Sequence, residues 1–129
     1  MKALVAAVGG VWAVDLETEE AEPVGGVELD LPPPPPLSLP RVVAAAASGS
    51  TVIAVVDRRP PLLVSNDAGA TWREAGGGLP PGRALAIAPD DPDLVLYAAR
   101  ERLYVSRDGG RFWSALAVEL PEILALTLG

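Results

Sequence analysis

The feature that most constrains this chain is a repeated segment of eight residues. Ser65–Trp72 reads S-x-D-x-G-x-T-W, and Ser106–Trp113 reads S-x-D-x-G-x-F-W. Every matched residue recurs 41 positions later, as Ser65 and Ser106 do. Self-similarity with a period of about 40 residues is typical of repeat architectures, in which each repeat is one supersecondary unit.

The flanks of the two segments repeat as well. Leu-Pro steps at 39–41, 79–83 and 120–122 each precede a short apolar run. Four such runs fit between successive steps, and they are rich in Val, Leu and Ala, as in strands buried between packed layers. A unit of this size with four strands matches one blade of a β-propeller.

The two octapeptides resemble the Asp-box, or BNR repeat, of sialidases, sortilin-like receptors and several glycosidases. The resemblance implies an all-β fold made of β-propeller blades, each with strands A to D from the axis outward. In that family the motif lies in the turn between strands C and D, on the outer part of the propeller. We therefore expect three four-stranded blades in one domain, residues 1–129.

The blade boundaries follow from the apolar runs. The second blade, 41–76, is expected to hold strands Val42–Ala47, Thr51–Asp57, Pro61–Ser65 and Thr71–Ala75. The third, 83–119, is expected to hold strands Ala84–Ala88, Leu94–Ala99, Leu103–Ser106 and Phe112–Val118. The first, 2–30, has only strands B to D, at Lys2–Val8, Val11–Leu16 and about Ala21–Val27. Its missing strand A is predicted at 123–128, because joining that segment to the first sheet would pair an otherwise open edge.

Three blades are too few for a closed ring, since propellers typically have four to eight. Two chains give six blades, so the sequence favours a homodimer that completes one ring. In a head-to-tail pair, Ile123–Leu128 would complete the first blade of the partner. The sequence leaves open which chain supplies this strand, and it also allows a non-propeller β monomer or pairing with a different propeller half.

The repeated residues are expected to have structural roles. An Asp carboxylate accepts backbone N–H bonds within a tight turn, glycine takes positive φ freely, and Trp packs against a neighbouring strand or blade. Thr71 and Phe112 are expected to point inward. This set is Ser65, Asp67, Gly69, Thr71, Trp72, Ser106, Asp108, Gly110, Phe112 and Trp113. The alternative is carbohydrate stacking on Trp72 or Trp113.

A candidate ligand site is expected where the D–A and B–C loops meet at the mouth of the axial tunnel. Arg41 and Arg83 stand at matching positions before strand A, and Glu122 is their counterpart in the first blade. Guanidinium groups bind carboxylate and phosphate in a bidentate manner. We expect an anionic small molecule or a peptide carboxylate to bind there, with ion pairing to Glu122, Asp57 and Glu101 as the alternative. The candidate residues are Arg41, Arg58, Arg59, Arg83, Arg100 and Glu122.

The composition excludes several classes of chemistry. The chain has no Cys and no His, which excludes disulfides, zinc–thiolate sites and Ser–His triads. Its formal net charge of −7 argues against nucleic-acid binding. No long uncharged apolar stretch predicts a membrane span. No cofactor or metal is expected. Asp90-Asp91-Pro92-Asp93 suggests a Ca²⁺ ligand set as an alternative to simple turn geometry.

Catalysis is not expected. The N-terminal arginine motif of the sialidases has no match, and both tyrosines, Tyr97 and Tyr104, fall inside strands. Glycosidic hydrolysis otherwise needs two carboxylates across a cleft, and no pair stands out. We therefore expect a noncatalytic propeller that serves as a binding or assembly platform. The alternative is a small glycoside hydrolase or a lectin-like sugar binder.

Two segments and one compositional trend leave further alternatives open. The first 14 residues read as two strands around Gly9-Gly10, or as a short secretory signal. The first reading predicts a cytoplasmic protein and the second a secreted one. Pro32–Pro36 is expected to be a stiff polyproline II spacer rather than a ligand for a proline-recognition domain. Abundant proline and few thermolabile residues suggest a thermophilic source, although GC-rich coding would look similar.

Overall fold

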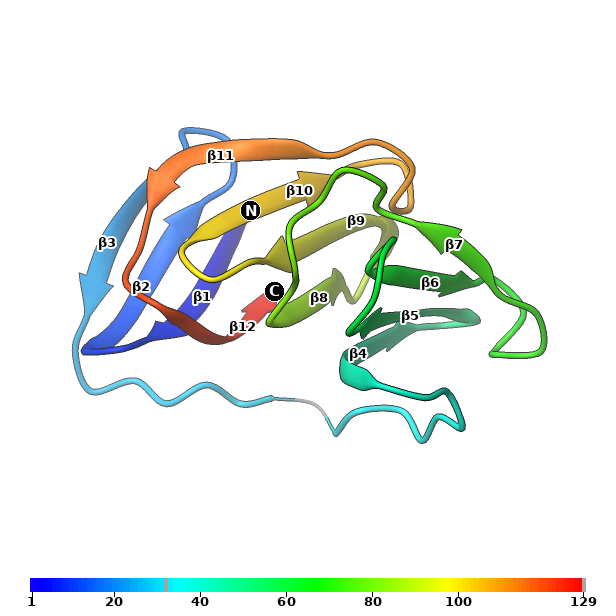
Figure 1. Ribbon diagram of the computed structural model, residues 1–129. Helices are drawn as coiled ribbons and strands as arrows, with labels where there is room; N and C mark the ends of the chain where they lie inside the picture. The colour runs from blue at the N-terminus through cyan, green and yellow to red at the C-terminus, as the bar shows by residue number, and fades with distance from the viewer. Residues whose placement is uncertain (32, 129) are drawn as a thin grey trace.

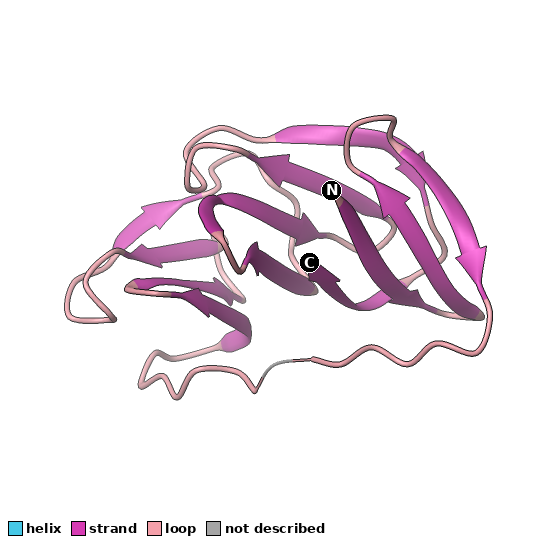
Figure 2. Ribbon diagram, turned by 180° about the vertical axis from the view of Figure 1, so that it is seen from behind, coloured by secondary structure: helices cyan, strands magenta, loops and turns pink. Residues whose placement is uncertain are grey.

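Strands account for all the regular structure in residues 1–31 and 33–128, which the computed structural model describes. Twelve strands form three separate four-stranded antiparallel sheets in this part of the chain (Figures 1 and 2). No helix there is long and apolar enough to cross a lipid bilayer. The expectation of an all-β chain with three four-stranded sheets is confirmed, and we call these sheets blades 1 to 3.

The strands of each blade are adjacent in the chain, except for one. Blade 1 contains β12 (Ile123–Leu128), β1 (Lys2–Ala7), β2 (Gly10–Asp15) and β3 (Glu20–Val24), in that order from the inner edge. Blade 2 contains β4 (Val42–Ser48), β5 (Thr51–Val56), β6 (Leu62–Ser65) and β7 (Arg73–Ala75). Blade 3 contains β8 (Ala84–Ala88), β9 (Asp91–Ala98), β10 (Arg102–Ser106) and β11 (Ser114–Glu119).

The closing strand of blade 1 comes from the other end of the same chain. Strand β12 pairs antiparallel with β1, and Leu4 lies opposite Thr127 while Val5 lies opposite Leu126. The strand exchange that we inferred for a head-to-tail pair is therefore wrong for this structure. The connection explains the difference, because β11 ends three residues before β12 begins and the short turn leads straight into the first sheet.

Blade 3 lies between the other two. Its inner strand β8 is adjacent to both β12 and β4, so the three inner strands stand side by side. One apolar core fills the junction of blades 1 and 3, and a second fills the junction of blades 3 and 2. The burial of β8 and of residues 94–98 in β9 on both faces follows from this position.

The outer blades have a different burial pattern. In β1, buried and half-buried residues alternate, because a single face of blade 1 meets another blade. All six residues of β5 are buried, although β5 also belongs to an outer blade. At the rim of the blade 1–3 junction the outer strands β3 and β11 run close together, and the Ala117 N–H donates to the Glu19 carboxylate there.

A connector, residues 25–41, joins blade 1 to blade 2, and its described residues, 25–31 and 33–41, form no strand. In Figure 1 it leaves the end of β3, crosses the open side of the three blades and reaches the start of β4. Pro32, the first residue of the proline run, lies outside the described residues. At about 3 Å per residue in an extended or polyproline II conformation, a connector of this length spans the open side.

Candidate functional site

A large hollow lies on the inner side of the three blades. A cavity of about 760 Å³ is bounded by the inner strands β4, β8 and β12 and by the connector. Its wall is formed by residues 43–47, 84–87 and 124–128, with Asp30, Leu31 and the prolines at 33–35 closing the open side. This is the place where a propeller has its axial tunnel, and we call it the axial cavity.

The wall of the axial cavity is apolar. Alanines dominate the inner strands because three strands approach one another closely there. Larger apolar side chains remain accessible at its rim, where Leu31 is 50% exposed, Val43 48% and Leu124 55%. Exposed apolar side chains gathered around one hollow indicate a binding surface more often than isolated ones do.

Two charged residues line the axial cavity, Asp30 in the connector and Arg83 on the strand wall. Arg83 precedes β8 and lines the cavity, and its guanidinium lies 3.8 Å from the Glu122 carboxylate. Arg100, in the turn between β9 and β10, donates to the same carboxylate over 3.0 Å. Two guanidinium groups thus share one carboxylate, which leaves this cluster with a net positive charge. The sequence grouped these three residues, although the expectation of a ligand there remains a proposal.

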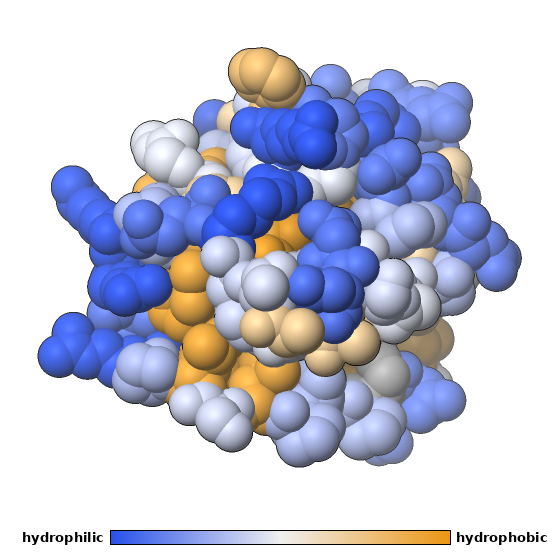
Figure 3. Space-filling model, turned by 90° about the vertical axis from the view of Figure 1, so that its right-hand side faces the viewer, coloured by the Kyte–Doolittle hydropathy of each residue, from blue (hydrophilic) through white to orange (hydrophobic). Residues whose placement is uncertain are grey.

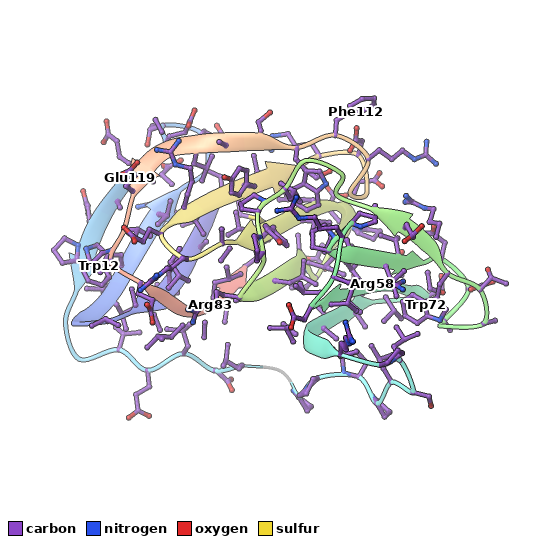
Figure 4. The ribbon with its side chains drawn as sticks, in the orientation of Figure 1. Trp12, Arg58, Trp72, Arg83, Phe112 and Glu119 are labelled. Atoms are coloured by element: carbon purple, nitrogen blue, oxygen red, sulfur yellow. The ribbon has the colours of Figure 1, made fainter. Side chains whose placement is uncertain are left out.

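The other predicted mouth residues lie elsewhere. Arg58 is 3.9 Å from Glu74 of blade 2, a pairing that the sequence analysis did not consider (Figure 4). Arg41 takes a left-handed backbone conformation, with φ of 60°, and its carbonyl accepts the Asp57 N–H. Within residues 1–31 and 33–128, neither Arg41 nor Arg59 joins an ion pair or lines the axial cavity.

The turn between β6 and β7 is built around Asp67. Its carboxylate accepts the Ser65 hydroxyl, the Thr71 hydroxyl and the Thr71 N–H. The Thr71 hydroxyl, the Thr71 N–H and the Ser65 hydroxyl together lower the pKa of Asp67 from 3.8 to about 2. The Ser65 oxygen in turn accepts the N–H of Gly69, which has φ of 91°. Side-chain acceptors therefore replace the sheet hydrogen bonds that the turn interrupts.

The turn between β10 and β11 repeats this pattern around Asp108. The Ser106 hydroxyl donates to the Asp108 carboxylate over 2.7 Å, and the Ser106 oxygen accepts the Gly110 N–H. The Phe112 N–H, followed by the Ser106 hydroxyl, lowers the pKa of Asp108. The two turns differ at one position, since Phe112 cannot supply the hydroxyl that Thr71 gives to Asp67.

Phe112 does not point inward as expected, and neither does Thr71, which is exposed and donates its hydroxyl to Asp67 within the turn. The Phe112 side chain is 79% exposed and projects away from the top of blade 3 in Figure 4. Trp113 takes the inward direction instead: its ring lies 5.8 Å from the Tyr97 ring in an edge-to-face arrangement, and its N–H donates to Gly110 O. Adjacent residues in an extended chain point to opposite sides, so 112 and 113 cannot both face the core.

Blade 1 forms a similar turn with fewer side-chain hydrogen bonds. Between β2 and β3, the Asp15 carboxylate accepts the N–H groups of Glu17 and Thr18, and these bonds lower its pKa. The turn at Asp15 is not a third copy of the repeat, because the glycine and tryptophan of the repeat are absent here. It shows that an Asx-type turn is the shared physical solution in all three blades.

The acidic run at 90–93 has turn geometry. Asp91 begins β9, and its carboxylate accepts the Asp93 N–H over 3.1 Å. Among the residues that the structure describes, no three Asp or Glu side chains are grouped so that they could hold a metal ion. A Ca²⁺ site there has no further support.

The comparisons with known proteins concern the fold. Neither a protein-family model nor a curated protein sequence matches the chain. Among solved structures, the GH74 enzyme of Niastella koreensis is similar, with a TM-score of 0.54 and 22% sequence identity. The match covers 96% of this chain and 19% of that one, so the chain spans about a fifth of the enzyme's length. GH74 enzymes contain β-propellers, and the likeness supports a propeller-like arrangement of the three blades.

The connector is the part of the site that the sequence analysis missed. It was interpreted as a spacer, whereas Asp30, Leu31 and Pro33–Pro35 form part of the cavity wall. The sequence contains a signal for this contact, because a spacer exposed to solvent has few apolar side chains. The connector has four leucines, at positions 29, 31, 37 and 39.

Proposed function

We propose that this chain is a noncatalytic binding module whose axial cavity accepts an anionic ligand with an apolar body. The observation that carries the proposal is the combination of an apolar strand wall with a single guanidinium group, while the one lining carboxylate, Asp30, belongs to the connector. The cavity is lined mainly by Ala, Leu and Pro, and Arg83 is the cation among its described lining residues. An apolar pocket with few convergent polar groups is the usual form of a small-molecule site.

The Arg83–Glu122–Arg100 cluster supports the choice of an anion. Glu122 already accepts Arg100 over 3.0 Å, and Arg83 is held more loosely at 3.8 Å. A ligand carboxylate therefore competes with a long, partly exposed ion pair, which is worth little by itself. The guanidinium group then gains a planar bidentate partner.

The alternative of a glycoside hydrolase has less support. Both glycosidase mechanisms need a pair of carboxylates about 5–10 Å apart across the bond that breaks. Asp30 is the one carboxylate among the described residues that line the axial cavity. Sugar binding without hydrolysis is a second candidate, which the fold likeness to a GH74 enzyme suggests. A glycan array would detect sugar binding, and a fluorogenic glycoside screen would detect hydrolysis.

The direct experiment is calorimetric titration with a matched ligand series. Medium-chain fatty carboxylates are compared with the alcohols of the same chain length. We expect the carboxylates to bind more tightly, and we expect Arg83→Ala to remove that preference. Arg58→Ala is the matched control, because Arg58 is also ion-paired but lies outside the cavity. Equal affinity for acid and alcohol, or no binding by either, would refute the proposal.

A further inference from the structure

Equivalent faces of blades 2 and 3 point the same way around the molecule. Blade 3 turns Leu96 and Val105 toward blade 1, where they join the first core. Their counterparts in the repeat, Val55 and Val64 of blade 2, are turned toward blade 3 in the second core. Each blade thus uses the same face to meet the next blade in the same direction.

The opposite face of blade 3 meets blade 2 through two aromatic residues. Tyr97 and Trp113 belong to the second core, and their repeat counterparts in blade 2 are Val56 and Trp72. Val56 lies on the face of β5 away from blade 3, because strand residues alternate and Val55 faces the core. This face of blade 2 corresponds to the face of blade 3 that receives blade 2, and its residues Val52, Ala54 and Val56, although buried, belong to neither of the two interblade cores.

Blade 1 has the complementary surface. Leu4 and Ala13 lie opposite each other in the β1–β2 pair, next to Ala3 and Val14, which are fully buried in the first core. Alternation places Leu4 and Ala13 on the face away from blade 3, together with Ala6. This face is apolar and half-buried, and Leu4, Ala6 and Ala13 belong to neither of the two interblade cores.

We propose that a second copy of this chain occupies both surfaces, with blade 1 of each copy packed on blade 2 of the other. The contact continues an interface that the chain already forms twice, between blades 1 and 3 and between blades 3 and 2. Made twice around a twofold axis, it closes a ring of six blades, which is within the range of known propellers. The inference rests on the sheet faces, and its tests measure assembly in the absence of any ligand of the axial cavity.

Two features define how the copies meet. On blade 2, Ala54 is 0% and Leu63 7% exposed, so the second copy meets this face mainly at the partly exposed Trp72. Figure 3, which views the blade 2 side, shows an apolar strip that remains visible between hydrophilic side chains. The connector crosses the open side in the single chain, so the ring requires it to leave this position, and with it the part of the axial cavity wall formed by Asp30 and Leu31.

The first test is the mass of the full chain in solution, by light scattering after size exclusion. We expect twice the 13.3 kDa of one chain. Ala13→Lys places a charge in the contact and is expected to give the monomer, while Ala115→Lys, on the exposed outer strand β11, stays dimeric. A wild-type monomer, or a dimeric Ala13→Lys variant that keeps the wild-type circular dichroism spectrum, would overturn the proposal.

The second test distinguishes head-to-tail packing from a contact of blade 1 with blade 1. The chain has no native cysteine, so Ala13→Cys and Ala70→Cys can be made as clean single variants. A flexible bis-maleimide is expected to link a mixture of the two variants. Linkage in the Ala13→Cys sample alone would instead show a blade 1–blade 1 contact and would contradict the ring, as would no linkage in the mixture.

Discussion

The ring of Tyr97 closes over the backbone of Gly82, and its hydroxyl donates to the Pro80 carbonyl over 2.6 Å. A Cβ at Gly82 would lie 2.5 Å from the Tyr97 oxygen and 2.6 Å from Cζ. Tyr97 is fully buried, and burial raises the pKa of its hydroxyl, so the ring is held in the neutral form. This contact fixes the path of the chain from blade 2 into β8, and with it the position of Arg83.

Gly82→Ala is therefore expected to lower the free energy of unfolding by about 1–3 kcal/mol, the usual cost of overpacking a filled core. The neighbouring atom is a buried ring that cannot move away cheaply. Urea unfolding followed by tryptophan fluorescence would show the change. Gly77→Ala is the control, because a Cβ there meets no atom within 4 Å. Equal stability of the two variants would contradict the contact.

Ser106→Ala is expected to destabilise the chain by about 1–2 kcal/mol. Ser106 is 1% exposed, and its hydroxyl both donates to Asp108 and accepts the Gly110 N–H. The variant leaves that N–H without its acceptor in a buried turn. Ser114→Ala, at an exposed position of β11, should change stability by less than about 0.5 kcal/mol. Thermal unfolding of the two variants side by side would measure the difference. Equal melting temperatures would show that the Ser106 hydroxyl does not stabilise the turn.

Phe112→Thr is expected to lower the pKa of Asp108 further. Thr71 gives its hydroxyl to Asp67, and that bond is the largest cause of the low pKa of Asp67. Position 112 is the repeat counterpart of position 71 and supplies a backbone N–H alone. Carboxyl ¹³C shifts followed through an acid titration would report the change. Phe112→Val, which lacks the hydroxyl, should leave the titration of Asp108 as it is.

The pH dependence of stability should contain a contribution from Asp67. Its folded pKa of about 2 is below the ordinary value of 3.8, so the stabilising bonds are fully present above pH 3.8. They are lost as the pH falls through about 2. The difference in free energy of unfolding between the wild type and Asp67→Asn should therefore shrink as the pH falls from the ordinary pKa of 3.8 to the folded pKa of about 2. A difference that stays constant over this range in urea unfolding experiments would show that the carboxylate is not held as described.

The strands could be predicted because their signals are local. The repeat located the two turns at Asp67 and Asp108, and the apolar runs located β4 to β6 and β8 to β10. The pairing of 123–128 with the first sheet followed from counting strands, since blade 1 lacked its inner member. The turns and apolar runs are signals within a few residues, whereas the pairing of the two chain ends required a count over all three blades.

The arrangement of the blades could not be predicted in the same way. Blade 3 lies in the middle because β12 returns to β1 within one chain, and the connector of 25–41 has no pattern that fixes its path. Phe112 was predicted to point inward, but neighbouring side chains alternate in direction and Trp113 is the one that packs on the second core. The Arg58–Glu74 pair depends on side-chain positions that no sequence spacing indicates.

The account depends most on the pairing of β1 with β12 inside one chain. Isotope-filtered nuclear Overhauser spectra of an equal mixture of labelled and unlabelled chains test it directly. We predict cross-strand contacts between Leu4 and Thr127 and between Val5 and Leu126 within labelled chains. The same contacts between a labelled and an unlabelled chain, or their absence from both, would contradict it.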